Sequence, residues 1–162
     1  MKPALLIIDI QNEFLKISPA CSDSLKSAIE YINAAITLFR KRNLPVVVIQ
    51  DKIEGLPEGS PGFDVPESVR LELKDIRIIK TYGNSFRNTG LAEKLRELGV
   101  DTVIVTGFCA EFCVLSTYIG AQDFDLVPMI LKGSLASGNA EHIRFVEEIS
   151  EIISIGALKA ML

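Results

Sequence analysis

The sequence has no tryptophan, a single histidine (His142) and only three cysteines among its 162 residues. A lone histidine excludes mechanisms and zinc sites that require several imidazole groups. Three cysteines are an odd number and do not make a disulfide framework, which favours a reducing compartment. We therefore expect a cytoplasmic protein whose stability comes from a hydrophobic core.

Long apolar runs, a basic character and glycine-rich nucleotide motifs are also missing. No apolar stretch approaches the ~20 residues of a membrane span, and the chain enters a predicted strand almost at once, without the layout of a signal peptide. A net charge of −4 argues against a general nucleic-acid binder. No Gly-x-Gly-x-x-Gly or P-loop follows the first predicted strand, which disfavours a nucleotide- or flavin-binding module. Neither nucleic acid nor membrane is expected as a partner.

Apolar residues nevertheless make up 48% of the chain, enough for the core of one domain over residues 1–162. Six short runs rich in valine, isoleucine and leucine are typical of buried strands: residues 5–8, 45–49, 76–79, 102–106, 126–131 and 152–155. Helical segments lie between them, at residues 22–42, 89–99 (with Thr89 as the cap), 111–124 and 140–150. This alternation predicts a three-layer α/β/α fold with a six-stranded, mostly parallel sheet.

Three reactive side chains lie at the carboxyl ends of predicted strands. Asp9 follows the first strand, Lys80 follows the third, and Cys113 lies just beyond the fourth, in the first turn of a helix. These ends meet at one edge of a parallel sheet, where ligands bind. Buried charges are costly unless paired, so Asp9 and Lys80 are expected to form an ion pair. A rim ion pair and an inert cysteine are the structural alternatives, but the coincidence of all three favours a catalytic site.

The chemistry open to this trio is nucleophilic acyl transfer. Asp9 would take the thiol proton and return it to the departing amine, while Lys80 would hold the carboxylate and favour the thiolate. A helix start also favours a thiolate, so a hydrolase is predicted to have a Cys113 pKa well below ~8.5 that depends on Asp9 and Lys80, and this pKa separates it from a catalytically silent member. His142 falls in the helix at 140–150 and is expected in the core or on the surface, which disfavours a cysteine–histidine arrangement.

Three motifs follow one another along the chain: Asp9-Ile-Gln-Asn-Glu-Phe14, Lys80-Thr-Tyr-Gly-Asn-Ser-Phe86 and Gly107-Phe-Cys-Ala-Glu-Phe-Cys-Val114. Together they resemble the isochorismatase-like cysteine hydrolases, a family that includes nicotinamidases and N-carbamoylsarcosine amidases. The resemblance covers nearly the whole chain. It implies a Rossmann-like α/β fold and an amidase that cleaves a C–N bond of a small amide or carbamoyl compound through a thioester intermediate.

The resemblance also assigns roles to individual residues. It implies a catalytic triad of Asp9, Lys80 and Cys113, with the backbone amides of Cys109 and Cys113 as the oxyanion hole. It further implies a cis peptide bond between Phe108 and Cys109, which is rare before a residue other than proline.

The substrate pocket is predicted from side chains that lie close in sequence to the triad. Aromatic walls suit a small planar or apolar acyl group, although phenylalanines near a sheet edge are usually core residues. We expect only two or three of the aromatic residues to touch a ligand, and the loop at residues 54–66 to shape the pocket. The predicted pocket residues are Gln11, Phe14, Tyr82, Phe86 and Phe108.

The chain departs from the nicotinamidase pattern after the second predicted strand. Metal-binding nicotinamidases carry Asp-x-His there, whereas this chain has Asp51-Lys-Ile53. We therefore predict no metal and no cofactor. Asp51 is ambiguous: a loop cap or turn residue is the favoured interpretation, and a substrate contact is the alternative. Isochorismate hydrolysis does not rely on a nucleophilic thiol, so Cys113 favours the amidase branch. Nicotinamidase and isochorismatase activities are the less favoured readings.

Two alternatives concern the protein as a whole. A catalytically silent or scaffolding member would keep the fold and the assembly without the chemistry. Family members commonly form dimers to octamers, and the apolar residues of the helix at 111–124 and of residues 152–162 offer surface for such contacts. A homo-oligomer is therefore expected, of an order that the sequence does not specify.

Overall fold

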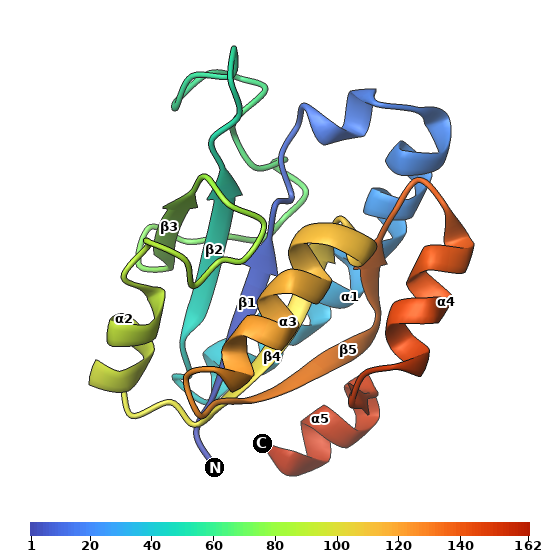
Figure 1. Cartoon of the computed structure of the whole chain (residues 1–162). Coiled ribbons are helices and arrows are strands. Elements are labelled where there is room, and N and C mark those ends of the chain that lie inside the picture. Colours follow the sequence, from blue (N-terminus) through green and yellow to red (C-terminus); the bar gives the residue numbers. More distant parts are fainter.

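The computed structural model describes residues 1–162 and contains one six-stranded sheet (Figure 1). The strands lie in the order β3-β2-β1-β4-β5-β6, and every neighbouring pair is parallel. The predicted α/β fold is thereby confirmed. The strand bounds are β1 (Pro3–Ile8), β2 (Val46–Asp51), β3 (Ile76–Lys80), β4 (Thr102–Phe108), β5 (Val127–Ala136) and β6 (Ile152–Ile153).

Helices cover both faces of the sheet and make three layers (Figure 1). One face packs against α1 and α5, and the other against α2, α3 and α4. None of these helices has the length and apolar content needed to cross a membrane. Their bounds are α1 (Pro19–Lys41), α2 (Leu91–Glu97), α3 (Leu115–Gln122), α4 (Ala140–Glu148) and α5 (Ile155–Met161), with a 3-10 turn at Phe14–Lys16 and a π-helical turn at Ala110–Val114, hereafter the π-turn.

Alternate residues of β1 supply the two halves of the core. Leu5 and Ile7 pack under α1, whereas Leu6 and Ile8 face the helices of the opposite layer. This alternation follows from the two-residue period of a strand. All six residues of β1 are buried, as expected for a central strand of a parallel sheet.

Several local details differ from the sequence-based expectation, and the helix expected at residues 111–124 is divided into the π-turn, which holds Cys113, and α3. The last strand is only Ile152–Ile153, because Ser154 caps a helix that the sequence analysis missed, with its Oγ accepting a hydrogen bond from the Ala157 amide at 3.1 Å. The cap of α2 is Gly90 at a φ of 73° rather than Thr89. Strand β5 continues five residues past the expected end at residue 131, to Ala136.

The carboxyl ends of the central strands form the edge at which the predicted site lies. Gly107 in β4 has a φ of 121°, and a Cβ there would overlap the backbone of Ile8. Only glycine lets β4 approach β1 so closely just before Asp9 leaves the strand. The segment at residues 52–66 projects beyond this edge (Figure 1).

Candidate active site

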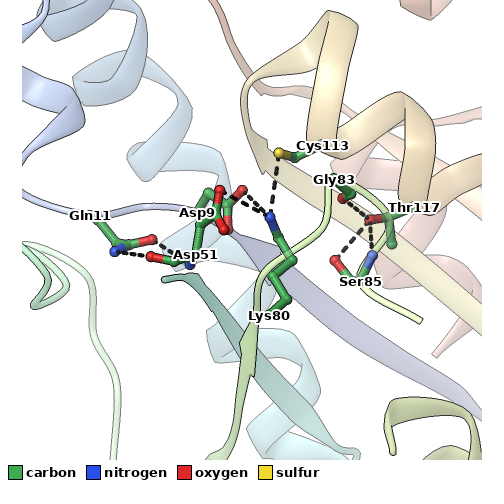
Figure 2. Close-up of polar contacts among 8 residues, drawn as sticks. All are labelled: Asp9, Gln11, Asp51, Lys80, Gly83, Ser85, Cys113 and Thr117. Carbon is green, nitrogen blue, oxygen red and sulfur yellow. Dashed lines mark hydrogen bonds and ion pairs between the residues drawn. The ribbon is translucent and has the colours of Figure 1, made fainter. Parts of the chain in front are cut away.

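Four polar side chains meet at this edge (Figure 2). The Lys80 Nζ lies 2.9 Å from Asp9 Oδ2, 3.5 Å from Asp51 Oδ2 and 3.4 Å from Cys113 Sγ. The side chains of Lys80 and Asp9 are 0% and 2% exposed. The predicted ion pair between Asp9 and Lys80 is confirmed. We call Asp9, Asp51 and Lys80 the ion cluster.

The backbone around the strand ends holds this cluster in place. Asp9 adopts a left-handed conformation with a φ of 52°, and its amide donates to the Ile49 carbonyl at 2.9 Å. The buried Gln11 amide group accepts from the Asp51 amide at 2.7 Å and donates to the Asp51 carbonyl at 3.1 Å. Gln11 therefore fastens the end of β2, and its role in the pocket stays a prediction.

The carboxyl group of Asp9 has an unusual environment. Burial raises its pKa to about 6, although the Lys80 ammonium acts in the opposite direction. One of its oxygens, Oδ1, is buried and has no hydrogen-bond partner. Burial also opposes the charge on Lys80, but Asp9, Cys113 and Asp51 together raise the pKa of Lys80 above its usual value. Asp9 thus keeps an unused acceptor beside the thiol.

The predicted lowering of the Cys113 pKa is wrong. Burial and, after it, the negative charge of Asp9 raise the pKa of the Cys113 thiol to about 12, and the Lys80 ammonium does not outweigh them. Sequence reasoning counted the helix start and Lys80 but had no measure of desolvation. The site at rest therefore holds a neutral thiol next to a carboxylate with a free oxygen.

The π-turn connects the end of β4 to Cys113. The peptide bond between Phe108 and Cys109 is cis, which confirms the expectation from the resemblance. The Cys109 carbonyl accepts hydrogen bonds from the amides of Phe112 at 3.1 Å and Val114 at 3.2 Å. The Cys109 amide itself donates no hydrogen bond within the chain, so it is free to bind an oxyanion. The oxyanion roles of the Cys109 and Cys113 amides stay predictions.

A second carboxylate lies on the other side of the turn. Glu111 accepts hydrogen bonds from Cys109 Sγ at 2.9 Å and Ser137 Oγ at 3.0 Å, and its Oε1 lies 2.6 Å from His142 Nδ1. Burial opposes the charge of Glu111, but these three partners hold its pKa below the usual value. His142 is exposed on α4, where a surface position was one of the expectations. We call Glu111 and its three partners the Glu111 cluster, which sequence reasoning missed.

The loop after Lys80 is held by α3 (Figure 2). The Thr117 hydroxyl accepts from the Ser85 amide at 3.0 Å, lies 2.8 Å from the Ser85 hydroxyl and donates to the Gly83 carbonyl at 3.4 Å. Gly120 allows the close approach, since a Cβ there would overlap the Asn84 side chain. The only sequence signal for this contact is the position of Thr117, four residues after Cys113.

Comparison with known proteins places the chain in a family. A family model described as the isochorismatase domain matches residues 3–148. The chain belongs to the isochorismatase family.

Individual relatives agree with this assignment. The isochorismatase family protein YddQ of Bacillus subtilis is 29% identical over 159 residues, which cover 90% of this chain and 88% of YddQ. An isochorismatase-like hydrolase from Alkaliphilus metalliredigens has a TM-score of 0.89 at 22% identity, with 99% of each chain covered. N-carbamoylsarcosine amidase from Thermoplasma acidophilum has a TM-score of 0.81 at 24% identity, covering 96% of this chain and 97% of the amidase. The two structural matches show a shared fold.

The predicted pocket residues of this family member have unequal positions. Phe14 is partly exposed, and its ring centroid lies 5.0 Å from that of the buried Phe108. Tyr82 is 39% exposed and lies beneath the guanidinium of Arg87 at 3.9 Å. Phe86 is buried in the core and stacks on Phe124. Of the predicted aromatic pocket residues, the structure thus leaves Phe14 and Tyr82 accessible, and the pocket assignment stays a prediction.

Three side chains of the site have the chemistry of metal ligands. The donor atoms of Asp9, Asp51 and Cys113 all lie within 4.8 Å of one another. The Lys80 ammonium, however, lies 3.5 Å or less from all three, so it already supplies the positive charge that these groups surround. A metal ion would have to displace this ammonium, so the residues do not fit a resident metal. Asp51, expected to be a turn residue, is instead an ion-pair partner of Lys80.

Proposed function

We propose that the protein is a metal-independent cysteine amidohydrolase that cleaves a C–N bond in a small amide or carbamoyl compound. One observation carries the proposal: the Asp9 carboxylate and the Cys113 thiol share the buried Lys80 ammonium, and Asp9 Oδ1 has no partner. A carboxylate with a free acceptor beside a thiol is the arrangement that a general base and a nucleophile require.

In the first half of the reaction Asp9 takes the proton of the Cys113 thiol as the sulfur attacks the substrate carbonyl carbon. The negative charge that develops on the carbonyl oxygen is bound by the free amide of Cys109. Asp9 then gives the proton to the departing amine, so the C–N bond breaks and a thioester forms on Cys113. Lys80 keeps Asp9 in position and limits the cost of burying its charge.

In the second half a water molecule replaces the amine. Asp9 takes a proton from this water as the oxygen attacks the thioester carbonyl, and the same amide binds the oxyanion. The C–S bond then breaks, the proton returns to the sulfur, and a carboxylic or carbamic acid leaves. Each group ends in its starting protonation state, so no cofactor is consumed.

Amide chemistry is supported by the fold shared with N-carbamoylsarcosine amidase and by the thiol, which suits acyl transfer. A cytoplasmic location and assembly into a homo-oligomer remain part of the proposal. Helices α3 and α4 carry exposed apolar side chains, such as Ile119 and Phe145, and a second copy of the chain would bury them.

An ammonia-release screen of small amides, carbamoyl compounds and nicotinamide tests the proposal, with Cys113→Ala as the control. We expect release that depends on Cys113, together with a covalent acyl adduct on Cys113 detected by mass spectrometry after rapid acid quenching. Release that persists unchanged in Cys113→Ala would refute the assigned nucleophile. Absence of release from every compound class would favour a silent or scaffolding member.

A further inference from the structure

Asp51 differs from the rest of the ion cluster in being open to solvent. Its side chain is 25% exposed, whereas those of Lys80 and Asp9 are 0% and 2% exposed. Apart from the ammonium at 3.5 Å, no side chain or amide pairs with its carboxylate. Like Asp51, Cys113 is only partly buried. A molecule that reaches Cys113 therefore meets the carboxylate of Asp51 but not the ammonium of Lys80.

Asp51 is also held close to the reacting atom. One of its carboxylate oxygens lies within 4.8 Å of Cys113 Sγ. Its backbone is fixed on both sides by the Gln11 amide group, and the next residue, Lys52, donates to the Lys80 carbonyl at 2.8 Å. The carboxylate is therefore a preorganised part of the site, because the strand end that carries it is pinned.

The charges around the sulfur do not balance. Lys80 neutralises one carboxylate, and Asp9 and Asp51 together carry two, so the ion cluster has one excess negative charge beside the nucleophile. This excess charge favours hydrogen-bond donors and positive groups, and it disfavours a second carboxylate close to the sulfur.

We propose that Asp51 determines specificity, accepting a hydrogen bond from an N–H or cationic group beside the scissile carbonyl, so that the site takes ureido-like or cationic amides and rejects amides with a carboxylate there. This inference rests on the proposed amidohydrolase function for its substrate class. Its electrostatic part concerns the surroundings of Cys113 and is measurable without any substrate.

The first test uses thiol reagents of different charge. Cationic trimethylammonioethyl, neutral methyl and anionic sulfonatoethyl methanethiosulfonates are compared by their rates of modifying Cys113, with the site assigned by peptide mass spectrometry. Relative to a free thiol in solution, we expect the cationic reagent to be favoured over the anionic one by about tenfold. Asp51→Asn should remove most of this preference. Glu13→Gln, which removes an exposed carboxylate that pairs with Lys16 at 2.8 Å, should change it less than about twofold.

The second test uses matched amides. β-Alaninamide, 3-hydroxypropanamide and succinamate differ in carrying a positive, a neutral or a negative group, and ammonia release gives kcat/KM for each. We expect kcat/KM to fall in that order. Asp51→Asn should reduce the ratio of kcat/KM between β-alaninamide and succinamate by about tenfold. A purely structural Asp51 would lower all three values in parallel.

The outcomes separate the two proposals. A reagent preference that Asp51→Asn leaves unchanged, or a Cys113 that reacts with none of the reagents, overturns the inference whether or not amides are hydrolysed. A preference for the anionic reagent also overturns it. A preference abolished by Asp51→Asn without hydrolysis of any amide supports the electrostatic role and overturns the proposed function.

Discussion

Two carboxylates flank the turn that carries Cys113, and their surroundings are opposite. Asp9 in the ion cluster is buried, has one partner and keeps Oδ1 free, and burial raises its pKa to about 6. Glu111 has three partners shared between its two oxygens, and these hold its pKa below the usual value despite burial. One carboxylate is left able to take a proton, whereas the other is saturated.

This difference assigns Asp9 to proton transfer and Glu111 to a structural role. A carboxylate with an unused oxygen and a raised pKa gains from accepting a proton, so it suits a general base. A carboxylate saturated by donors gains nothing from a proton and instead ties together the segments that carry those donors. Glu111 joins the π-turn to the end of β5 and to α4 in this way. The two groups differ in partners, not in residue chemistry.

The largest expected effect comes from exchanging the two carboxylates for amides. Asp9→Asn keeps the size of the side chain but removes the base, so kcat/KM for a cleaved amide should fall about 10³-fold or more. Glu111→Gln is the matched variant, and its loss should stay within about tenfold because an amide oxygen still accepts hydrogen bonds. Steady-state kinetics on both proteins decides the comparison. Equal losses would show that Glu111 shares in the chemistry.

Removing the ammonium should have the next largest effect. Lys80→Met leaves Asp9 as an unpaired buried carboxylate, so the free energy of unfolding should fall by about 3 kcal/mol and kcat/KM by about 10²-fold near neutral pH. Lys52→Met is the control, because Lys52 pairs with Glu58 on the exposed surface and should cost less than about 0.5 kcal/mol. Urea denaturation measures both. A Lys80→Met protein as stable as the control would contradict the buried pair.

The pH dependence of kcat/KM should report the ion cluster. Asp9 must be ionised to accept the thiol proton and its pKa is raised to about 6, so the rate should fall about tenfold for each pH unit below this value. The apparent pKa of this acid limb of the pH profile belongs to the coupled groups of the ion cluster rather than to Asp9 alone. Because the charge of Asp51 helps to raise this pKa, Asp51→Asn should move the limb to lower pH. A limb that stays at the ordinary aspartate pKa of about 4 would contradict the desolvated base.

The raised pKa of Asp9 also makes the free energy of unfolding depend on pH. The folded pKa of Asp9 lies above its usual value of 3.8, so its contribution to stability is present in acid and is lost as the pH rises through about 6.

The smallest expected effects concern the partners of Glu111. Ser137 is buried and also accepts from the Asn139 amide at 3.1 Å, so Ser137→Ala should lower the free energy of unfolding by about 1–2 kcal/mol. His142 is exposed, and His142→Ala should cost less than about 1 kcal/mol and change kcat/KM less than about twofold. Thermal denaturation and kinetics measure the pair. A large kinetic effect of His142→Ala would assign this histidine to the reaction.

Much of the site was predictable because its residues interrupt buried runs. Asp9 and Lys80 stand at the ends of apolar strands, and a charge in such a place needs a partner, which the structure supplies at 2.9 Å. Asp51 also ends a strand, yet nothing local distinguished it from a turn residue. Glu111 carries no periodic signal, and its partners Ser137 and His142 lie 26 and 31 residues away in the sequence.

The amino-acid sequence by itself determined the layered parallel sheet and the strand ends at which Asp9, Lys80 and Cys113 lie, because the alternation of apolar strand runs with helical segments is a local property of the chain. Only the tertiary structure decided which charges meet, which oxygen stays without a partner and how deeply the thiol is buried. Those properties raise the pKa values of Asp9 and Cys113, whereas the helix-start argument predicted a low pKa for Cys113. The physical reason is that desolvation and charge pairing depend on every segment packed around a group, whereas its position on a strand depends on its neighbours in sequence.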